Sequence, residues 1–145
     1  MIYLGADHGG FSFKENIKKF LDELKIEYQD LGNFKFEPDD DFADYALLVA
    51  KKVAETNGKG ILFCTNGLGM CITANKIKGI RAVVPTTKKV AEQSREHLDA
   101  NVLCLGEHVV SFKDAKKIIK IWLETEFFKK DKYIRRLEKI KEIEK

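Results

Sequence analysis

The sequence contains no apolar stretch that approaches the roughly 20 residues needed for a membrane-spanning helix. Its opening residues, MIYLGADHGG, have neither the basic segment nor the cleavage signature of a secretory signal. We therefore expect a cytoplasmic protein without a membrane partner.

Cysteine is scarce as well. The three cysteines, Cys64, Cys71 and Cys104, cannot all pair within the chain. Two of them lie on or beside apolar runs, where a reduced thiol is stable, so no disulfide framework is indicated. The seven-residue separation of Cys64 and Cys71 fits no common zinc spacing, and no histidine pair lies nearby. We expect no metal site and place Cys71 and Cys104 in the core.

Over most of the chain, basic and acidic residues nearly balance. The formal net charge is +3, and from Lys129 onward eight Lys or Arg residues stand against four Asp or Glu residues, so the excess lies in the tail. A basic tail can meet nucleic acid, a phosphate-bearing small molecule or only water. The interleaved Glu138, Glu142 and Glu144 argue against a nucleic-acid surface.

Short apolar runs alternate with longer amphipathic segments. We predict strands at residues 2–6, 60–63, 82–84 and 101–105, with a weaker strand at 27–31. The first intervening segment repeats apolar residues at helical spacing, namely Phe13, Ile17, Phe20, Leu21 and Leu24. Nearly all-apolar strands separated by helices predict one α/β domain over residues 1–145, with a doubly wound, five-stranded parallel sheet.

An extra helix is predicted at the C-terminal end. Ser111, followed three residues later by Asp114, is typical of a capping box and opens the helix after the fifth strand. A basic amphipathic helix then covers about residues 129–145, and its apolar stripe consists of Tyr133, Ile134, Leu137 and Ile140. This stripe must be buried on the same domain or on a second subunit. We expect a homodimer, and a tetramer stays open.

Ligands of doubly wound sheets bind beyond the carboxyl ends of the strands. Reactive groups gather there in this sequence, as ADHGG after the first strand, CTNGLG after the third and EH at 107–108 after the fifth. Cys64 directly precedes a glycine-rich turn into a helix, whose N–H groups and dipole favour a thiolate and can hold an oxyanion or a phosphate. A buried structural cysteine is the competing interpretation.

Three sharper motifs are absent from this turn. A P-loop needs Gly-Lys-Ser/Thr where Met70 and Cys71 stand. The dinucleotide fingerprint lacks its third glycine, because Ile72 occupies that position. A thiol phosphatase would need an arginine at position 70, to bind the phosphate dianion.

Two polar segments can be interpreted either as functional or as purely structural. Asp7 and His8 form either a functional pair or a turn cap beside an exposed histidine. We interpret the acidic run, which contains Glu37, Asp39, Asp40 and Asp41, as a solvated loop whose last aspartate caps the next helix.

Blocks spread over almost the whole chain resemble the type B ribose-5-phosphate isomerase family, which includes allose and galactose 6-phosphate isomerases. These blocks are IYLGADHGGFSFK, FADYALLVA, GILFCTNGLGMCITANKIKGIRAVV, SREHLDANVLCLGEHVV and RRLEKI. The resemblance implies a doubly wound, Rossmann-like α/β unit that dimerises, with sites at the subunit interface. It also implies aldose–ketose isomerisation through an enediolate, without a metal or organic cofactor.

The resemblance assigns roles to individual residues. Cys64 matches the catalytic base, and His97 matches the acid/base that opens the sugar ring. Asp7 matches a residue that contacts the sugar near its ring oxygen. The backbone of the following loop would stabilise the enediolate oxygen, where charge develops; its residues are Asn66, Gly67, Leu68, Gly69 and Met70.

His8 and Arg136 match positions that hold the substrate phosphate. Four positions depart from the family's usual residues: Asn66 stands for Thr, Leu98 for Asn, and Lys132 and His108 for Arg. Lys132 keeps its charge but loses the bidentate fork of arginine. Leu98 removes an amide, which costs about 1 to 3 kcal/mol if a polar partner is left unpaired.

We therefore expect an isomerase that interconverts ribose 5-phosphate and ribulose 5-phosphate. An isomerase of allose or galactose 6-phosphate is one alternative. A catalytically weak sugar-phosphate binding protein or partner subunit is another, and Leu98 and Asn66 motivate it. A thiol-dependent hydrolase on a similar scaffold is a third.

Overall fold

All five strands of the computed structural model, which describes residues 1–145, form one parallel sheet in the order β2-β1-β3-β5-β4. The strands are β1 (Ile2–Ala6), β2 (Tyr28–Asp30), β3 (Lys59–Cys64), β4 (Ala82–Val83) and β5 (Val102–Gly106). The chain moves from β1 outward to β2 and then returns past β1 to β3. The predicted doubly wound parallel sheet is confirmed.

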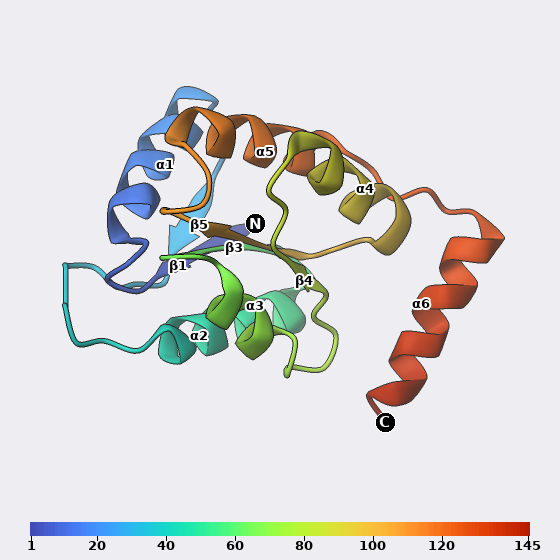
Figure 1. Ribbon diagram of the computed structural model, residues 1–145. Helices are drawn as coiled ribbons and strands as arrows, with labels where there is room; N and C mark the ends of the chain where they lie inside the picture. Colours follow the sequence, from blue (N-terminus) through green and yellow to red (C-terminus); the bar gives the residue numbers. More distant parts are fainter.

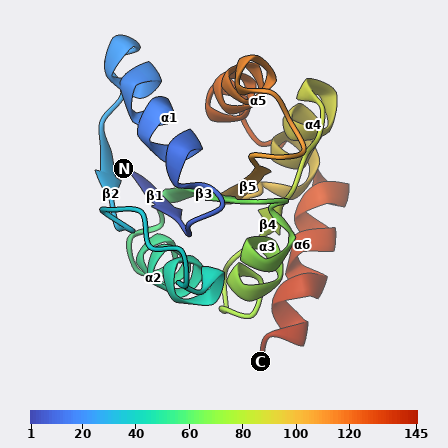
Figure 2. The same cartoon turned by 60° about the vertical axis from the view of Figure 1, so that its left-hand side comes forward.

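Helices cover both faces of the sheet, as Figures 1 and 2 show. One face carries α1 (Phe11–Glu23), α4 (Lys88–Leu98) and α5 (Phe112–Glu124), and the other carries α2 (Phe42–Thr56) and α3 (Leu68–Ala74). None of the helices is both long and apolar enough to cross a membrane.

The interior consists of two cores, one on each face of the sheet, and the side chains of β3 point alternately into one and the other. Ile61 and Phe63 belong to the core beneath α1, α4 and α5, which also contains the fully buried Trp122. Leu62 and Cys64 belong to the core beneath α2 and α3. Successive side chains of a strand point to opposite faces, so the Cys64 thiol faces the α2 and α3 side at the carboxyl end of its strand.

Gly10 permits a close approach of the first βα turn to β3. A Cβ atom added at Gly10 would overlap the Phe63 carbonyl group and approach the Cys64 backbone nitrogen. Only glycine avoids this overlap. The packing places the loop after β1 directly against the strand end that carries Cys64.

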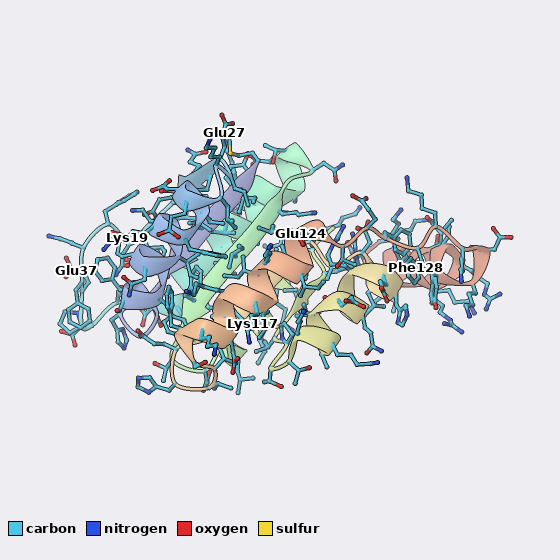
Figure 3. The ribbon with its side chains drawn as sticks, turned by 90° about the horizontal axis from the view of Figure 1, so that it is seen from above. Lys19, Glu27, Glu37, Lys117, Glu124 and Phe128 are labelled. Carbon is cyan, nitrogen blue, oxygen red and sulfur yellow. The ribbon has the colours of Figure 1, made fainter.

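The last helix, α6 (Asp131–Ile143), projects from the β4 side of the sheet (Figure 1). In Figure 3 the chain passes Glu124 and Phe128, and α6 continues beyond the layer that α1, α5 and α4 form. None of its residues is buried, and Ile134, Ile140 and Ile143 remain exposed. The predicted apolar stripe therefore exists, but this subunit does not bury it.

Candidate active site

The first candidate cluster lies where the strand order reverses, between β1 and β3. Ala6 pairs with Phe63, so the next residues of each chain segment, Asp7 and Cys64, lie side by side. The Asp7 N–H donates to the Phe63 carbonyl at 3.4 Å. This is the crevice in which open α/β sheets bind their ligands.

Backbone N–H groups surround the Cys64 thiol, as the sequence predicted. The N–H of Gly67 donates to Cys64 Sγ at 3.0 Å, and Gly67 has φ = 81°, which favours glycine. Burial nevertheless raises the pKa of the Cys64 thiol above its ordinary value, although N–H groups of Gly67, Met70 and Asn66 act to lower it. The expected thiolate-favouring balance is therefore wrong for this subunit, because desolvation outweighs the N–H groups.

Cys71 is the more ionisable thiol. Hydrogen bonding by Cys104 and Asn75 lowers the pKa of Cys71 to about 7, against the opposing effect of burial. Cys104 is fully buried, as expected, but Cys71 is only half-buried. Cys71 packs against the edge of the core beneath α2 and α3, so its assignment to the core is confirmed only in part.

This difference predicts an order of chemical modification. Because the thiolate is the reactive form, iodoacetamide at pH 7.5 is expected to modify Cys71 well before Cys64. The Cys71 rate should reach half of its maximum near pH 7 and level off about one to two pH units higher. Peptide mass spectrometry over time measures both rates in one sample. Faster labelling of Cys64 would contradict the elevated pKa of its thiol.

The loop after β3 uses two of its own N–H groups internally. Besides the Gly67 contact with the thiol, the Leu68 N–H donates to Asn66 Oδ1 at 3.0 Å. Met70 is completely buried, so only its backbone can face a ligand. The first-turn N–H groups of a helix lack intrahelical acceptors, and α3 presents its first turn beside Cys64.

The loop after β1 contains the buried Asp7 and the half-exposed His8. Asp7 Oδ1 accepts from the Gly9 N–H at 2.9 Å, and burial raises the pKa of Asp7. His8 Nδ1 lies 2.8 Å from Asp40 Oδ1. Asp40 therefore does not belong to a merely solvated loop, and that interpretation of the acidic run is corrected.

The loop after β5 is hydrogen-bonded to the end of β3. The N–H groups of Glu107 and His108 donate to the carbonyls of Cys64 and Thr65, each at 2.9 Å. The His108 side chain is exposed. Residues from three strand ends thus converge around Cys64.

A second cluster lies between α4 and α6. The His97 ring stacks on Tyr133, with centroids 4.9 Å apart and an interplanar angle of 15°. A cavity of about 450 Å³ beside this stack is lined in part by His97, Leu98, Tyr133 and Arg136. Lys132 Nζ lies 5.1 Å from the centroid of the Tyr133 ring.

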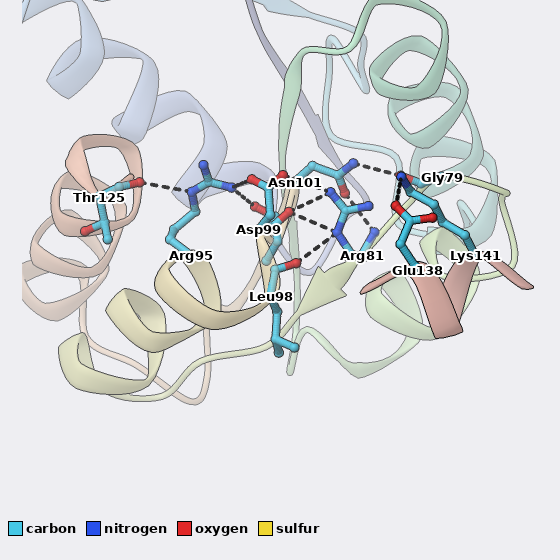
Figure 4. Close-up of polar contacts among 10 residues, drawn as sticks. Gly79, Arg81, Arg95, Leu98, Asp99, Asn101, Thr125, Glu138 and Lys141 are labelled. Atoms are coloured by element: carbon cyan, nitrogen blue, oxygen red, sulfur yellow. Dashed lines mark hydrogen bonds and ion pairs between the residues drawn. The ribbon is translucent and has the colours of Figure 1, made fainter. Parts of the chain in front are cut away.

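Two arginines that the sequence analysis missed fix the end of α4 (Figure 4). Arg81 Nε donates to the carbonyls of Leu98 at 2.9 Å and Asp99 at 3.0 Å. Arg95 Nη1 binds Asp99 Oδ1 at 2.8 Å, and Arg95 Nε donates to the Thr125 carbonyl at 3.2 Å. The Arg95–Asp99 pair has the i, i+4 spacing of a helix, which a sequence can show. No local motif signals the contacts of Arg81 with the end of α4 or of Arg95 with Thr125, because these partners are distant in the sequence.

His97 and Cys64 lie toward opposite ends of β5. His97 is in the last turn of α4, just before β5 begins at Val102, whereas Cys64 pairs with Gly106 at the end of β5. The strand between these ends is about 13 Å long at roughly 3.3 Å per residue. No residue of the Cys64 cluster lines the cavity beside His97. The chain therefore gathers the predicted residues into two separate clusters.

Comparisons with known proteins identify the family and the fold of this chain. A model of the Ribose/Galactose Isomerase family matches residues 2–140. Ribose-5-phosphate isomerase B of Escherichia coli strain K12 is 43% identical over 128 residues, which cover 87% of this chain and 85% of that protein.

Solved structures are similar over nearly the whole chain. Ribose-5-phosphate isomerase B of Clostridium thermocellum aligns with a TM-score of 0.94 and 43% identity, covering 99% of this chain and 96% of that one. The enzyme of the same name from Mycoplasma genitalium, with bound ribulose-5-phosphate, aligns with a TM-score of 0.94 and 36% identity, covering 99% and 95%.

Proposed function

Because the chain belongs to the ribose/galactose isomerase family, we propose that it interconverts ribose 5-phosphate and ribulose 5-phosphate. The observation that carries this proposal is the Cys64 thiol, surrounded by backbone N–H groups and set beside the buried Asp7 at the reversal of strand order. The ribulose 5-phosphate bound to the Mycoplasma genitalium relative supports the choice of substrate.

Cys64 is the base that moves a proton between the two neighbouring carbons. The Cys64 thiolate removes the proton from C2 of the open-chain aldose, a proton passes from the C2 hydroxyl to O1 of the enediolate, and the Cys64 thiol then gives its proton to C1. The thiolate is regenerated and no other reactant is consumed. The enediolate carries negative charge on oxygen, and N–H groups of the loop from Asn66 to Met70 stabilise it. A thiolate whose conjugate acid has a raised pKa is a stronger base, although less of it is present at neutral pH.

Ring opening precedes the proton transfer, because ribose 5-phosphate is mostly a closed furanose. His97 moves the proton between the anomeric hydroxyl and the ring oxygen. Asp7 contacts the sugar near that oxygen. Burial raises the pKa of Asp7, so its carboxyl group gains a proton more readily than an exposed aspartate does.

A second copy of the chain completes each site. The separation of His97 from Cys64 by the length of β5 supports this arrangement. Leu68 and Ile72 on α3 are exposed beside the Cys64 loop, and the apolar residues of α6 are also exposed. A homodimer in which α4 and α6 of one subunit face the Cys64 loop of the other would bury these surfaces.

His8, Arg136, Lys132 and His108 form the phosphate site. Replacing Arg136 with alanine is expected to raise KM for ribose 5-phosphate about tenfold or more, because a charge-assisted hydrogen bond to phosphate is lost. The kcat value should change much less. Steady-state kinetics measure this split, and Arg135→Ala on the same helix is the matched control. Equal effects of the two variants would remove Arg136 from the site.

The proposed reaction is tested by following ketose formation from ribose 5-phosphate, with allose 6-phosphate and galactose 6-phosphate assayed beside it. Turnover of ribose 5-phosphate with the largest kcat/KM is expected. Preference for a hexose phosphate would reassign the substrate within the family. If the protein binds these sugar phosphates but turns over none of them, the proposed activity is wrong.

A binding or partner subunit is the second candidate, and Leu98 is the observation that favours it. Leu98 is 41% exposed beside His97, in a cavity whose lining is half hydrophobic and half polar. An apolar group there cannot hydrogen-bond a sugar hydroxyl. Leu98→Asn distinguishes the two candidates, because activity that emerges only in this variant would assign the natural chain to a binding role.

A further inference from the structure

Asp40, in the loop between β2 and α2, places its carboxylate against His8 at the end of β1. Asp40 Oδ1 accepts from the His8 backbone N–H at 2.9 Å and also lies 2.8 Å from His8 Nδ1. The Asp40 side chain is only 9% exposed, whereas the His8 side chain is 39% exposed. One carboxylate oxygen therefore fixes both the backbone and the ring of His8.

The other oxygen of the same carboxylate is held from the interior. Asn33 Nδ2 donates to Asp40 Oδ2 at 2.7 Å, and the Asn33 carbonyl accepts from Lys14 Nζ at 2.5 Å. Lys14 is completely buried and pairs with Asp30 at 2.7 Å. Asp40 is thus the outer member of a polar chain that begins inside the fold, unlike Glu37 of the same loop, which lies at the rim in Figure 3.

We propose that Asp40 is a positioning residue, which holds Nδ1–H of His8 so that Nε2–H of the same ring donates to the substrate phosphate. This inference rests on the proposed function, because that function places His8 at the phosphate. A carboxylate at Nδ1 keeps the proton on that nitrogen and fixes the ring orientation. Nε2 then donates only when the ring is cationic.

The charges around His8 favour the cation. The hydrogen bond with Asp40 is the main cause that raises the pKa of His8, and the charge of Asp7 on the same loop adds to it. From α2, Tyr45 approaches Asp40 and has its own pKa raised. Because the His8 pKa is raised, phosphate binding through Nε2–H is present below that pKa and is lost as the pH rises through it.

Asp40→Asn removes the charge with little change in shape, and Asp39→Asn is the matched control, because Asp39 is an exposed neighbour on the same loop. We expect the His8 pKa to fall by about one unit in Asp40→Asn and to stay unchanged in Asp39→Asn. Proton NMR titration of the imidazole signals measures this in the full-length protein. The chain has only three histidines, and His8→Gln assigns the signal.

Calorimetry with inorganic phosphate then tests the consequence for binding. At pH 7.5, Asp40→Asn is expected to weaken phosphate binding relative to wild type, by up to the factor of about ten that a one-unit fall in the His8 pKa allows. As the pH is lowered to 5.5 and the ring gains its proton in both proteins, the two affinities should converge. Asp39→Asn should match wild type at both values.

Two results would overturn the proposal. An unchanged His8 titration in Asp40→Asn would show that the carboxylate does not control the ring. Tighter phosphate binding by Asp40→Asn at both pH values would show that Asp40 acts only by repelling the anion. Neither readout uses turnover, so a protein that shows both expected shifts but isomerises no sugar would refute the proposed activity and leave the role of Asp40 standing.

Discussion

Replacing Cys64 with alanine is expected to lower kcat for ribose 5-phosphate about a thousandfold, the scale of a lost general base. The thiol lies at the carboxyl end of β3, where the neighbouring N–H groups can stabilise the charge that its proton transfer creates. Alanine leaves those N–H groups and the phosphate site in place. Substrate binding should therefore survive, and KM should change little.

The pH dependence of turnover is a second test of Cys64 as the base. The base acts when deprotonated, and burial raises the pKa of Cys64, so kcat of the wild type, measured at saturating substrate, should rise with pH above neutrality. The residual rate of Cys64→Ala should lack this rise. Cys71→Ala is the matched control and should keep most of the activity. A Cys64→Ala protein with nearly normal turnover would remove Cys64 from the chemistry.

Replacing His97 with asparagine is expected to lower kcat/KM for ribose 5-phosphate about a hundredfold. The ring of His97 is held by its stack on Tyr133, and the end of α4 is fixed by Arg81. Asparagine can still hydrogen-bond, but it cannot carry a proton between the anomeric hydroxyl and the ring oxygen near neutral pH.

A substrate without a ring separates ring opening from isomerisation. Erythrose 4-phosphate cannot close a furanose, because its terminal oxygen carries the phosphate. If His97 opens the ring, the defect of His97→Asn should be several-fold smaller on this substrate than on ribose 5-phosphate. Glu96→Gln, the adjacent residue on α4, controls for disturbance of the helix. Equal defects on both sugars would assign His97 to another step.

The strands of the sheet could be predicted because most of them are marked by a short apolar run in the sequence. Apolar runs such as residues 101–105 have no solvated alternative, so they had to become buried strands. The cap of α5 is equally local, and Ser111 Oγ accepts from the Asp114 N–H at 3.1 Å. Asp41 takes the N-cap position of α2 as expected, but its side chain makes no capping hydrogen bond.

The electrostatics of the site were harder to predict, because they depend on residues far apart in sequence. The motif around Cys64 predicts the N–H groups that contact its sulfur, but the depth of burial that raises its pKa comes from the packing of α2 and α3. Asp40 looked like one of several loop carboxylates. Its partner His8 is 32 residues away, and no local pattern could distinguish it from Asp39.

The placement of α6 shows a different limit. Its stripe of apolar residues was correctly predicted, yet the chain covers this stripe only in part, through the stack of Tyr133 on His97, and buries none of its residues. The sequence indicates that a further covering surface is needed, but it cannot say which face of a partner supplies it. The same limit applies to the Cys64 and His97 clusters, because the proposed shared site needs a partner surface that the sequence does not specify.

A purified heterodimer tests the central claim most directly. One subunit would carry Cys64→Ala and the other His97→Asn, each with its own affinity tag, so that only mixed dimers are assayed with ribose 5-phosphate. If each site takes Cys64 from one subunit and His97 from the other, one of the two sites is intact, and about half of the wild-type activity should return. No recovery in a stable heterodimer would contradict the shared site, because both residues would then act within one subunit.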